Sequence, residues 1–319
     1  MKTYELAACP ACSSQASRLV ADGDALKDEI EELWQFHLLR RKHGVPARHL
    51  YDRAFFTLDP PLQLVACTEC GTLYRNPREK ADAVVETYEQ EQADAVVLES
   101  LFEAQKRSYR RQADELRRLA GRTGSGLEVG SYVGAFLAAA REVGWDFEGI
   151  DVNADAAEFA RGKGLHADAG SLDTVSVQRQ FDAVAIWNCF DQLSDPRATL
   201  AQAFALLSTG GILAIRVPNG QCYRRWRNGG RPGLVAGLVL AHNNLLGFPY
   251  RQGFTPTSLS QILERAGFRV EQIRHDVLVS TADPWTRRWA VWEERIVKRA
   301  LRLLSLGPAP WFEVYARKP

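Results

Sequence analysis

Short apolar runs alternate with stretches of helical periodicity from residue 126 onward. A strand-like run at 126–130 precedes a helical pattern at 135–143, and a second run at 147–151 precedes another helical pattern at 154–163. A strand, a helix and a second strand in this order form a βαβ unit, whose two strands are parallel. The pattern therefore predicts an α/β fold built on a mostly parallel sheet.

Two further stretches place apolar residues at helical spacing. The first, at 24–41, does so with Leu26, Ile30, Leu33, Phe36 and Leu39. The second, at 284–304, has tryptophan and aliphatic residues on one side and basic residues elsewhere. Such a helix can dock on a protein core, dimerise, or make peripheral contact with an anionic membrane, with core docking as the default.

The longest apolar segment, 234–248, is interrupted by His242, Asn243 and Asn244. It predicts a buried or substrate-facing piece of chain, because no apolar run reaches the roughly 18 residues of a transmembrane segment. Residues 1–12 are polar and charged where a signal peptide would be apolar. A cytoplasmic location is the expectation.

Length and charge narrow the class of protein. The chain has 319 residues, which suggests two domains, and 46% of them are hydrophobic, which is enough for a real core. Its 40 basic and 39 acidic side chains nearly cancel. Because no strong positive charge is present, a nucleic-acid partner is not expected, and any electrostatic preference must be local.

Four of the six cysteines form two C-x-x-C pairs, Cys9 with Cys12 and Cys67 with Cys70. This spacing lets one tight turn aim two thiolates at a single ion, so two pairs complete a tetrahedral zinc site. With four sulfur ligands no position stays open, and the predicted zinc is structural. The alternatives are four unliganded thiols, or one redox pair beside an incidental one.

A turn of small residues separates the first predicted strand from its helix. It runs from Glu128 through Gly130 to Gly134, where backbone amides can approach a ligand at the carboxyl end of the strand. Asp151 ends the second strand 21 residues after Gly130, the separation expected for a carboxylate that binds both ribose hydroxyls. Glycines in such turns also serve packing, so the glycine pair indicates a cofactor site only in combination with Asp151.

These residues resemble the first motifs of class I S-adenosylmethionine-dependent methyltransferases. Their pattern is an acid followed by x-G-x-G-x-G, which Glu128, Gly130 and Gly134 match, whereas Tyr132 stands at the middle glycine. This departure either tightens the cofactor pocket or disables it. The spacing of Gly130 and Gly134 is not G-x-G-x-x-G, which disfavours a nicotinamide-dependent oxidoreductase.

Further segments match the family in its order: 149–151 at the ribose acid, 168–172 at the adenine, 181–196 as the fourth strand and its loop, 207–219 as the fifth strand, and 254–268 as the last helix and turn. The cysteine pairs, followed by Asn76 and Pro77, resemble a ribbon found on some bacterial members. The resemblance implies cofactor contacts from Glu128, Gly130, Ser131, Tyr132, Gly134, Asp151, Val152, Asp168, Ser171, Leu172 and Asn188.

The expected architecture is a Rossmann-like seven-stranded methyltransferase sheet with an N-terminal zinc-ribbon domain and a helical linker. We place the ribbon with its inserted helix at 1–78, the linker at 79–120 and the methyltransferase domain at 121–319. The segments 268–275 and 312–317 should supply the final antiparallel pair of the sheet.

Methyl transfer is an in-line displacement, so a base is needed only if the acceptor must lose a proton. His242 is the leading base candidate because its pKa lies near neutrality, with Tyr250 and Asp191 behind it. A lone histidine in an apolar segment is otherwise a structural residue. The family often has a histidine where Gln192 stands, so that base is missing.

The expected acceptor is a small or medium polar molecule, with a sugar or a phosphorylated biosynthetic intermediate as the leading classes. Arg224, Arg225, Arg227 and Arg231 after the fifth strand could form a phosphate-binding lid, or simply a solvated loop. The alternative function is a non-catalytic S-adenosylmethionine-binding protein that uses the ribbon as an interaction platform. A nucleic-acid methyltransferase is disfavoured by the net charge of +1.

Overall fold

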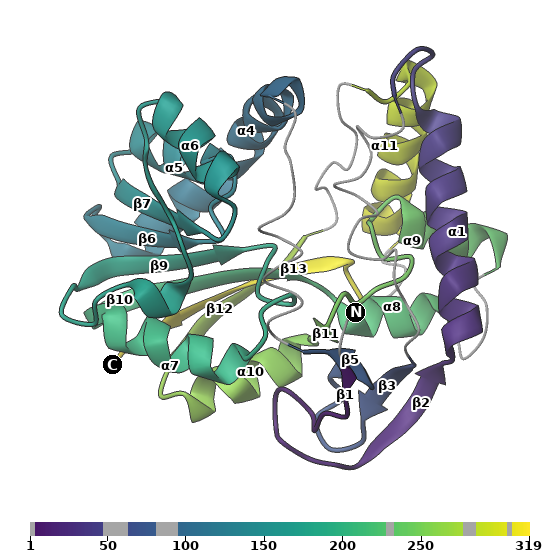
Figure 1. The fold of residues 1–319 in the computed structure, drawn as a ribbon, viewed down its shortest axis with the longest axis horizontal. Helices are drawn as coiled ribbons and strands as arrows, with labels where there is room; N and C mark the ends of the chain where they lie inside the picture. The colour runs from purple at the N-terminus through teal and green to yellow at the C-terminus, as the bar shows by residue number, and fades with distance from the viewer. Residues whose placement is uncertain (1–3, 47–62, 81–94, 228–232, 277–284, 305–307) are drawn as a thin grey trace.

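The computed structural model describes residues 4–46, 63–80, 95–227, 233–276, 285–304 and 308–319 (Figure 1). A layered α/β half with its central sheet lies beside a second half, which contains a smaller sheet and the helices α1, α8, α9 and α11. Among the described residues, no helix combines the length and the apolar character needed to span a bilayer.

Seven strands form the central sheet in the order β12-β13-β10-β9-β6-β7-β8. The strands from β10 to β8 are parallel, whereas β13 pairs antiparallel with β10 and β12. The bounds are β6 Ser125–Val129, β7 Asp146–Asp151, β8 His166–Ala169, β9 Phe181–Trp187, β10 Leu207–Pro218, β12 Arg269–Asp276 and β13 Trp311–Arg317. The predicted seven-stranded, mostly parallel sheet is confirmed, and so is its final antiparallel pair.

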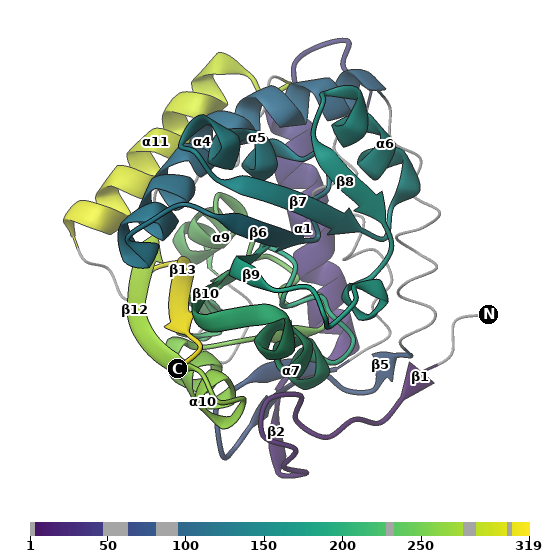
Figure 2. The ribbon, with the colours of Figure 1, turned by 90° about the vertical axis from the view of Figure 1, so that its left-hand side faces the viewer.

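Helices cover both faces of this sheet (Figure 2). One face packs against α4 Ala95–Ala120, α5 Ala135–Glu142 and α6 Ala154–Gly162, and the other against α7 Pro196–Leu206 and α10 Pro256–Arg265. Because both faces are buried, the central strands are almost continuously apolar, as β9 illustrates with its sequence FDAVAIW. A short 3₁₀ turn, η3 Leu172–Thr174, follows β8.

A second, four-stranded sheet has the order β11-β4-β3-β2. Its strands are β2 Ser17–Ala21, β3 Leu64–Cys67, β4 Leu73–Arg75 and β11 Gln252–Gly253, and a separate pair joins β1 Tyr4–Glu5 to β5 Arg78–Glu79. Three of the four strands come from the N-terminal region, but the edge strand β11 comes from the segment just before α10. The small sheet is therefore completed by a strand from far along the chain.

Four helices belong to this half of the molecule: α1 Gly23–Arg40, α8 Gly220–Arg227, α9 Leu234–Ala241 and α11 Arg288–Leu303, of which α11 contacts α1 and the end of α9. The helix predicted at 24–41 is present within one residue, and Asp22 caps it by accepting a hydrogen bond from the backbone N–H of Ala25 at 2.8 Å. The helix predicted at 284–304 forms over Arg288–Leu303. Its tryptophan side points outward, however, since its buried residues are Ala290, Glu294, Lys298 and Leu301.

Two buried charges join the N-terminal region to residues 220–253. The Arg75 guanidinium donates to the carbonyls of Pro249 at 2.7 Å and Gly247 at 2.9 Å. The Glu29 carboxylate accepts from Arg227 at 2.6 Å and from the Tyr223 hydroxyl at 2.8 Å. These segments share one apolar cluster, so the two regions form a common core.

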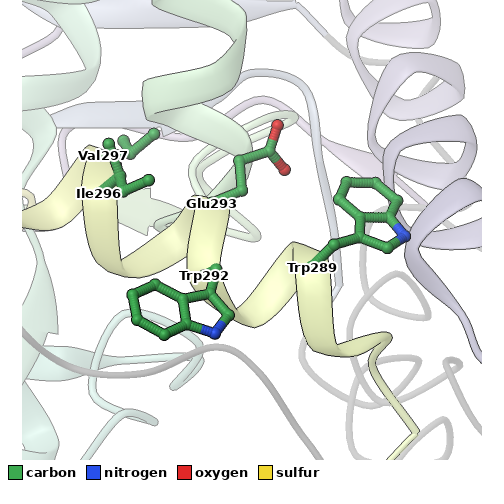
Figure 3. Close-up of a pocket in the computed structure, with 5 residues that line it drawn as sticks. All are labelled: Trp289, Trp292, Glu293, Ile296 and Val297. Atoms are coloured by element: carbon green, nitrogen blue, oxygen red, sulfur yellow. The ribbon is translucent and has the colours of Figure 1, made fainter.

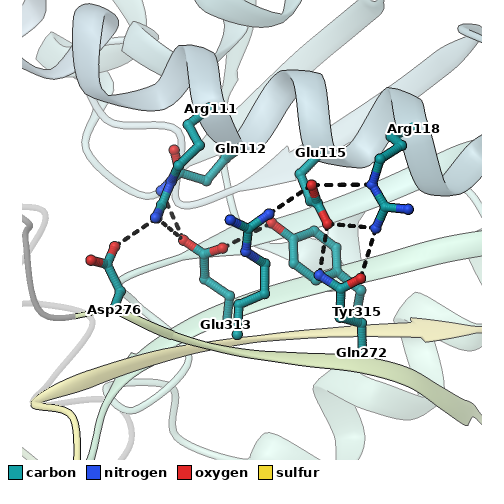
Figure 4. Close-up of polar contacts among 9 residues, drawn as sticks. Arg111, Gln112, Glu115, Arg118, Gln272, Asp276, Glu313 and Tyr315 are labelled. Atoms are coloured by element: carbon teal, nitrogen blue, oxygen red, sulfur yellow. Dashed lines mark hydrogen bonds and ion pairs between the residues drawn. The ribbon is translucent and has the colours of Figure 1, made fainter. Parts of the chain in front are cut away.

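Polar contacts hold the last turns of α4 against the sheet (Figure 4). Arg111 forms ion pairs of 2.6 Å with both Asp276 and Glu313. Further along the helix, Glu115 accepts from Gln272 at 2.6 Å and pairs with Arg274 at 2.7 Å. These contacts fix α4 above β12 and β13. The division of the chain at residues 78 and 120 stays a prediction, because 81–94 lie outside the described residues.

Replacing Glu29 with glutamine should lower the free energy of unfolding by about 3–5 kcal/mol, because it leaves the buried Arg227 guanidinium without a counter-charge. Chemical denaturation measures this change. Asp24→Asn on the same helix is the control: its pair with Lys27 is 98% and 63% exposed, and should cost less than about 1 kcal/mol. Equal losses in the two variants would contradict the assigned role of Glu29.

Candidate active site

The carboxyl ends of the parallel strands form one edge, and the strand order reverses beside β6. The chain builds β6, β7 and β8 outward in one direction, and then returns to place β9 on the other side of β6. The helices that follow β6 and β9, α5 and α7, cover opposite faces of the sheet. In open α/β sheets, ligands bind at the carboxyl edge beside such a switch point.

The loop after β6 is shaped by two glycines with left-handed backbone, Gly130 and Gly134, both at φ 71°. A Cβ atom on Gly130 would lie 2.6 Å from the sulfur of Cys189, so only glycine fits this approach to the loop after β9. Tyr132, at the middle position, also has a positive φ of 43°. It therefore keeps the local backbone shape that a glycine would adopt.

Asp151 ends β7 and is tied to this loop. Its carboxylate accepts the backbone N–H of Tyr132 at 2.7 Å and that of Asn153 at 2.9 Å. Burial raises the pKa of Asp151, while the two amides act in the opposite direction. A carboxylate offers about four lone-pair directions, so lone pairs remain for further donors. Ser131 packs beneath this loop against Gly149.

The neighbouring strand end brings the other predicted cofactor residues to the same edge. Val152 follows Asp151 directly, and Asp151 accepts the backbone N–H of Gly170 at 2.7 Å through its carbonyl oxygen. Asp168 lies on β8, and Ser171 and Leu172 begin the η3 turn. The structure thus gathers these residues beside Asp151, as the sequence motifs predict.

Glu128 lies within β6 with its side chain buried. One of its carboxylate oxygens, Oε2, has no hydrogen-bond partner among the residues that the structure describes. Burial raises the pKa of Glu128 well above its usual range, and the nearby Asp151 carboxylate adds to the effect. A buried carboxylate without a donor is costly, so this oxygen is suited to a cationic partner.

Arg216, near the end of β10, is a buried cation at the same edge. It is 3% exposed, and its Nη1 donates to the Oδ1 of Asn188. Within the described part of the chain, its Nε and Nη2 have no hydrogen-bond partner, since Glu313 is 3.9 Å away. The guanidinium also lies 4.5 Å from the centre of the Trp311 ring. Two nitrogens of this buried guanidinium are thus without an acceptor among the described residues.

Tyr109 and Asn188 form a hydrogen-bonded chain with Arg216. The Asn188 side chain donates to the Tyr109 hydroxyl at 3.0 Å and accepts from Arg216. Burial raises the pKa of Tyr109, the Glu128 charge raises it further, and the Arg216 charge lowers it. The charges of both Glu128 and Arg216 therefore act on the Tyr109 hydroxyl.

Asn188 is among the residues that the sequence singled out, but Tyr109, Arg216 and Trp311 are not. Arg216 could have been found from the sequence, because it is a charged residue inside the apolar run of the fifth predicted strand. Tyr109 and Trp311 give none, since they belong to α4 and to the final strand, far from the motif loops in the sequence.

The three base candidates occupy different surroundings. Asp191 is 1% exposed, and neither of its carboxylate oxygens has a hydrogen-bond partner among the described residues; burial raises its pKa to about 7. His242 caps α9 with its Nε2 3.3 Å from Glu293, and its ring is 4.8 Å from the ring of Phe36. Tyr250 is partly exposed. These contacts place His242 between α1 and α11.

Not all four arginines of the predicted phosphate-binding lid are accessible to a ligand. Arg227 is buried and committed to Glu29, so it is part of the core and not of a lid. Arg224 is partly exposed and Arg225 exposed, whereas Arg231 lies outside the described residues. The lid interpretation is therefore wrong for Arg227, because the pattern of arginines did not reveal its buried partner.

The four cysteines of the two C-x-x-C pairs gather in space. Their sulfur atoms all lie within 4.8 Å of one another, with Cys9 and Cys70 at 3.5 Å and Cys12 and Cys67 at 3.5 Å. Four sulfurs around a tetrahedral zinc ion at about 2.3 Å would be about 3.8 Å apart. The cluster therefore has the ligand type and the approximate spacing of a metal site.

This fold and site define a Rossmann-like α/β methyltransferase. A family model described as "Methyltransferase domain" matches residues 102–273, more than half of the chain. The chain belongs to this family, and it is a methyltransferase. No curated protein matches it in sequence.

Solved structures of methyltransferases are similar to it in part. The plantazolicin methyltransferase BpumL in complex with SAH has 14% identity and a TM-score of 0.46, with 92% of this chain and 98% of that chain covered. An S-adenosylmethionine-dependent methyltransferase from Mesorhizobium loti has 18% identity and a TM-score of 0.45, covering 64% and 96%. One from Archaeoglobus fulgidus has 20% identity and a TM-score of 0.43, covering 68% and 98%.

Asp191→Asn should raise stability at pH 8 and leave it nearly unchanged near pH 4. The folded pKa of about 7 lies above the unfolded value near 3.9, so the native state loses stability as pH rises through this window. Asparagine removes that loss, which is on the order of a few kcal/mol. Denaturation of both proteins at several pH values measures the difference. A pH-independent difference would show that Asp191 does not titrate in this range.

Proposed function

We propose that the protein transfers a methyl group from S-adenosylmethionine to a small or medium polar acceptor. The observation that carries the cofactor assignment is a pair of buried ionisable groups of opposite type at the strand edge. Glu128 presents an oxygen that has no donor among the described residues, and Arg216 presents two nitrogens, Nε and Nη2, that have no acceptor there. Hydrogen bonds through Asn188 join Arg216 to the Tyr109 hydroxyl.

The amino-acid end of S-adenosylmethionine carries an ammonium and a carboxylate on one carbon. In this proposal the ammonium donates to Glu128 and the carboxylate accepts from Arg216. Charge-assisted hydrogen bonds of this kind are about twice as strong as neutral ones. Binding would therefore satisfy two buried charges that the protein alone leaves without full compensation.

The rest of the cofactor follows the order of the strands. The sheet order β10-β9-β6-β7-β8 takes the ligand from its amino-acid end at Arg216, past the loop after β6, to the ribose at Asp151 and the adenine beside β8. Asp151, oriented by two backbone N–H groups, is assigned to the ribose hydroxyls together with the adjacent Val152. Gly130, Ser131, Tyr132 and Gly134 supply the loop backbone, and Asp168, Ser171 and Leu172 surround the adenine.

The cofactor supplies the electrophilic methyl group, and the protein's residues align it with the acceptor and exclude water. A base is needed only for an acceptor that loses a proton, and it must reach that proton. Asp191 and His242 are buried, whereas Tyr250 is partly exposed. Tyr250 is therefore our first choice for the base, and Tyr250→Phe, which removes only the hydroxyl, is the substitution to test with an identified acceptor.

For the acceptor we retain a sugar or a phosphorylated biosynthetic intermediate. Arg224 and Arg225 on α8 are the described arginines of their cluster that remain accessible to an anionic group. Transfer of labelled methyl from S-adenosylmethionine to sugar phosphates, to unphosphorylated sugars and to simple phenols would discriminate these classes.

The cysteine cluster is proposed to hold one structural zinc ion. Four thiolates would complete its coordination. Cys67 ends β3, and the same sheet has as its edge strand β11, which follows Tyr250 closely in the chain. The metal would thus stabilise the side of the site formed by residues 247–253. This role differs from that of a separate interaction platform.

Arg216→Gln should weaken binding of S-adenosylhomocysteine by about 10- to 100-fold, because a charge-assisted contact of about 1.5–3 kcal/mol is lost. The same variant should bind 5′-methylthioadenosine, which lacks the amino-acid end, within about twofold of the parent. Glu128→Gln should give the same pattern. Isothermal titration calorimetry with both ligands measures the four affinities.

Two controls accompany this test. Arg111→Gln removes another arginine from the Glu313 network without touching the proposed contact, and should change neither affinity. Asp151→Ala should weaken both ligands, since both contain the ribose. If Arg216→Gln weakens the two ligands equally, Arg216 shapes the pocket and does not bind the carboxylate.

Purified protein should contain about one zinc per chain, measured by plasma mass spectrometry, because two C-x-x-C pairs provide one tetrahedral shell. Cys9→Ser with Cys67→Ser should lose the metal and lower the thermal stability. Cys222→Ser is the matched control, since this buried thiol lies outside the cluster. Full metal content in the double variant would refute the site.

A further inference from the structure

Helix α11 is held to the protein by one face. Ala290 and Leu301 are buried, and Arg40 on α1 forms a two-bond ion pair with Glu293 at 2.7 and 3.0 Å. Glu294 is also buried and pairs with Lys298 at 2.6 Å. Both acidic residues of the helix are therefore directed toward other groups of the protein.

The outer face of α11 presents a stripe of large apolar side chains. On a helix that turns about 100° per residue, its four members fall within a sector of about 60°. They are Trp289, Trp292, Ile296 and Leu303, with exposed fractions of 50%, 60%, 63% and 81%. Figure 3 shows the two indoles projecting from the helix beside Ile296, around an open hollow of about 510 Å³.

A row of exposed arginines runs beside this stripe. By the same helical geometry, its members occupy an adjacent sector of about 60°. They are Arg288, Arg295, Arg299 and Arg302. The guanidinium of Arg295 lies 5.9 Å from the Trp292 ring, which shows that row and stripe meet. The outer face thus combines apolar area with four positive charges. Of the two acids of α11, Glu294 is buried, and Glu293, which borders the hollow, is paired with Arg40.

We propose that α11 docks on an anionic phospholipid surface, lying in the plane of the interface. The apolar stripe would enter the boundary between headgroups and acyl chains, where indoles are favoured, and the arginines would bind lipid phosphates. A helix of 16 residues is about 24 Å long, which is shorter than the roughly 30 Å hydrocarbon core, so it lies on the surface. This surface activity is additional to methyl transfer.

Charge makes a second copy of the chain a poorer partner for this face. A symmetric contact would bring the same patch of each copy together and place the two arginine rows close to one another. The acids that could pair with them, Glu293 and Glu294, are already engaged by Arg40 and Lys298. An anionic bilayer offers the opposite charge over a flat area that accommodates an exposed helix.

Co-sedimentation of the full chain with vesicles tests the proposal. Binding should be strong with 30% phosphatidylserine in phosphatidylcholine and at least tenfold weaker with phosphatidylcholine alone. Trp292→Gln with Ile296→Gln should weaken binding at least tenfold through lost apolar burial. Arg295→Gln with Arg299→Gln should weaken it roughly 20- to 30-fold, since each basic residue contributes about fivefold.

The matched control is Arg18→Gln with Leu19→Gln on β2, which removes one exposed arginine and one exposed leucine elsewhere. It should bind within about twofold of the parent. Thermal unfolding shows whether each variant is folded. The proposal is overturned if the parent does not prefer anionic vesicles, or if the α11 variants bind as well as the control. It is also overturned if sedimentation equilibrium without lipid shows a dimer that these variants abolish while vesicle binding stays absent.

Discussion

The reversal of strand order beside β6 is the constraint on which the rest of the structure depends. Because the chain returns across the sheet after β8, α5 after β6 and α7 after β9 cover opposite faces of the sheet, and ligands bind at the carboxyl edge beside such a switch point. Everything assigned to the cofactor lies at this edge. At this edge Gly130 lies close to Cys189, and two backbone N–H groups orient the Asp151 carboxylate.

The N-terminal region shares buried contacts with the later part of the chain. Strand β11 completes the sheet that begins with the cysteine ribbon, and Arg75 and Glu29 bind residues from the later part of the chain. Buried charges of this kind are destabilising unless every partner is present. The N-terminal strands and the segment 220–253 therefore depend on each other, which links the cysteine cluster to residues 247–253.

Buried charge is used in two ways in this protein. Glu29 and Arg227 satisfy one another, so their contact is structural. Glu128 and Arg216 each keep polar atoms without a partner in the described structure, and the charges of both act on the pKa of Tyr109. A protein that leaves opposite charges incompletely compensated at a ligand-binding edge is prepared for a ligand carrying both.

Sequence by itself determined the features that depend on local spacing. Periodicity predicts the strands and helices, the C-x-x-C pairs predict the sulfur cluster, and the separation of Gly130 from Asp151 predicts their meeting at one edge. Only the tertiary structure decided which distant groups meet. It paired His242 with Glu293, committed Arg227 to Glu29, turned the tryptophans of α11 outward and placed Arg216 beside Asn188. Local patterns reflect the geometry of single elements, whereas these contacts depend on how elements far apart in the chain pack together.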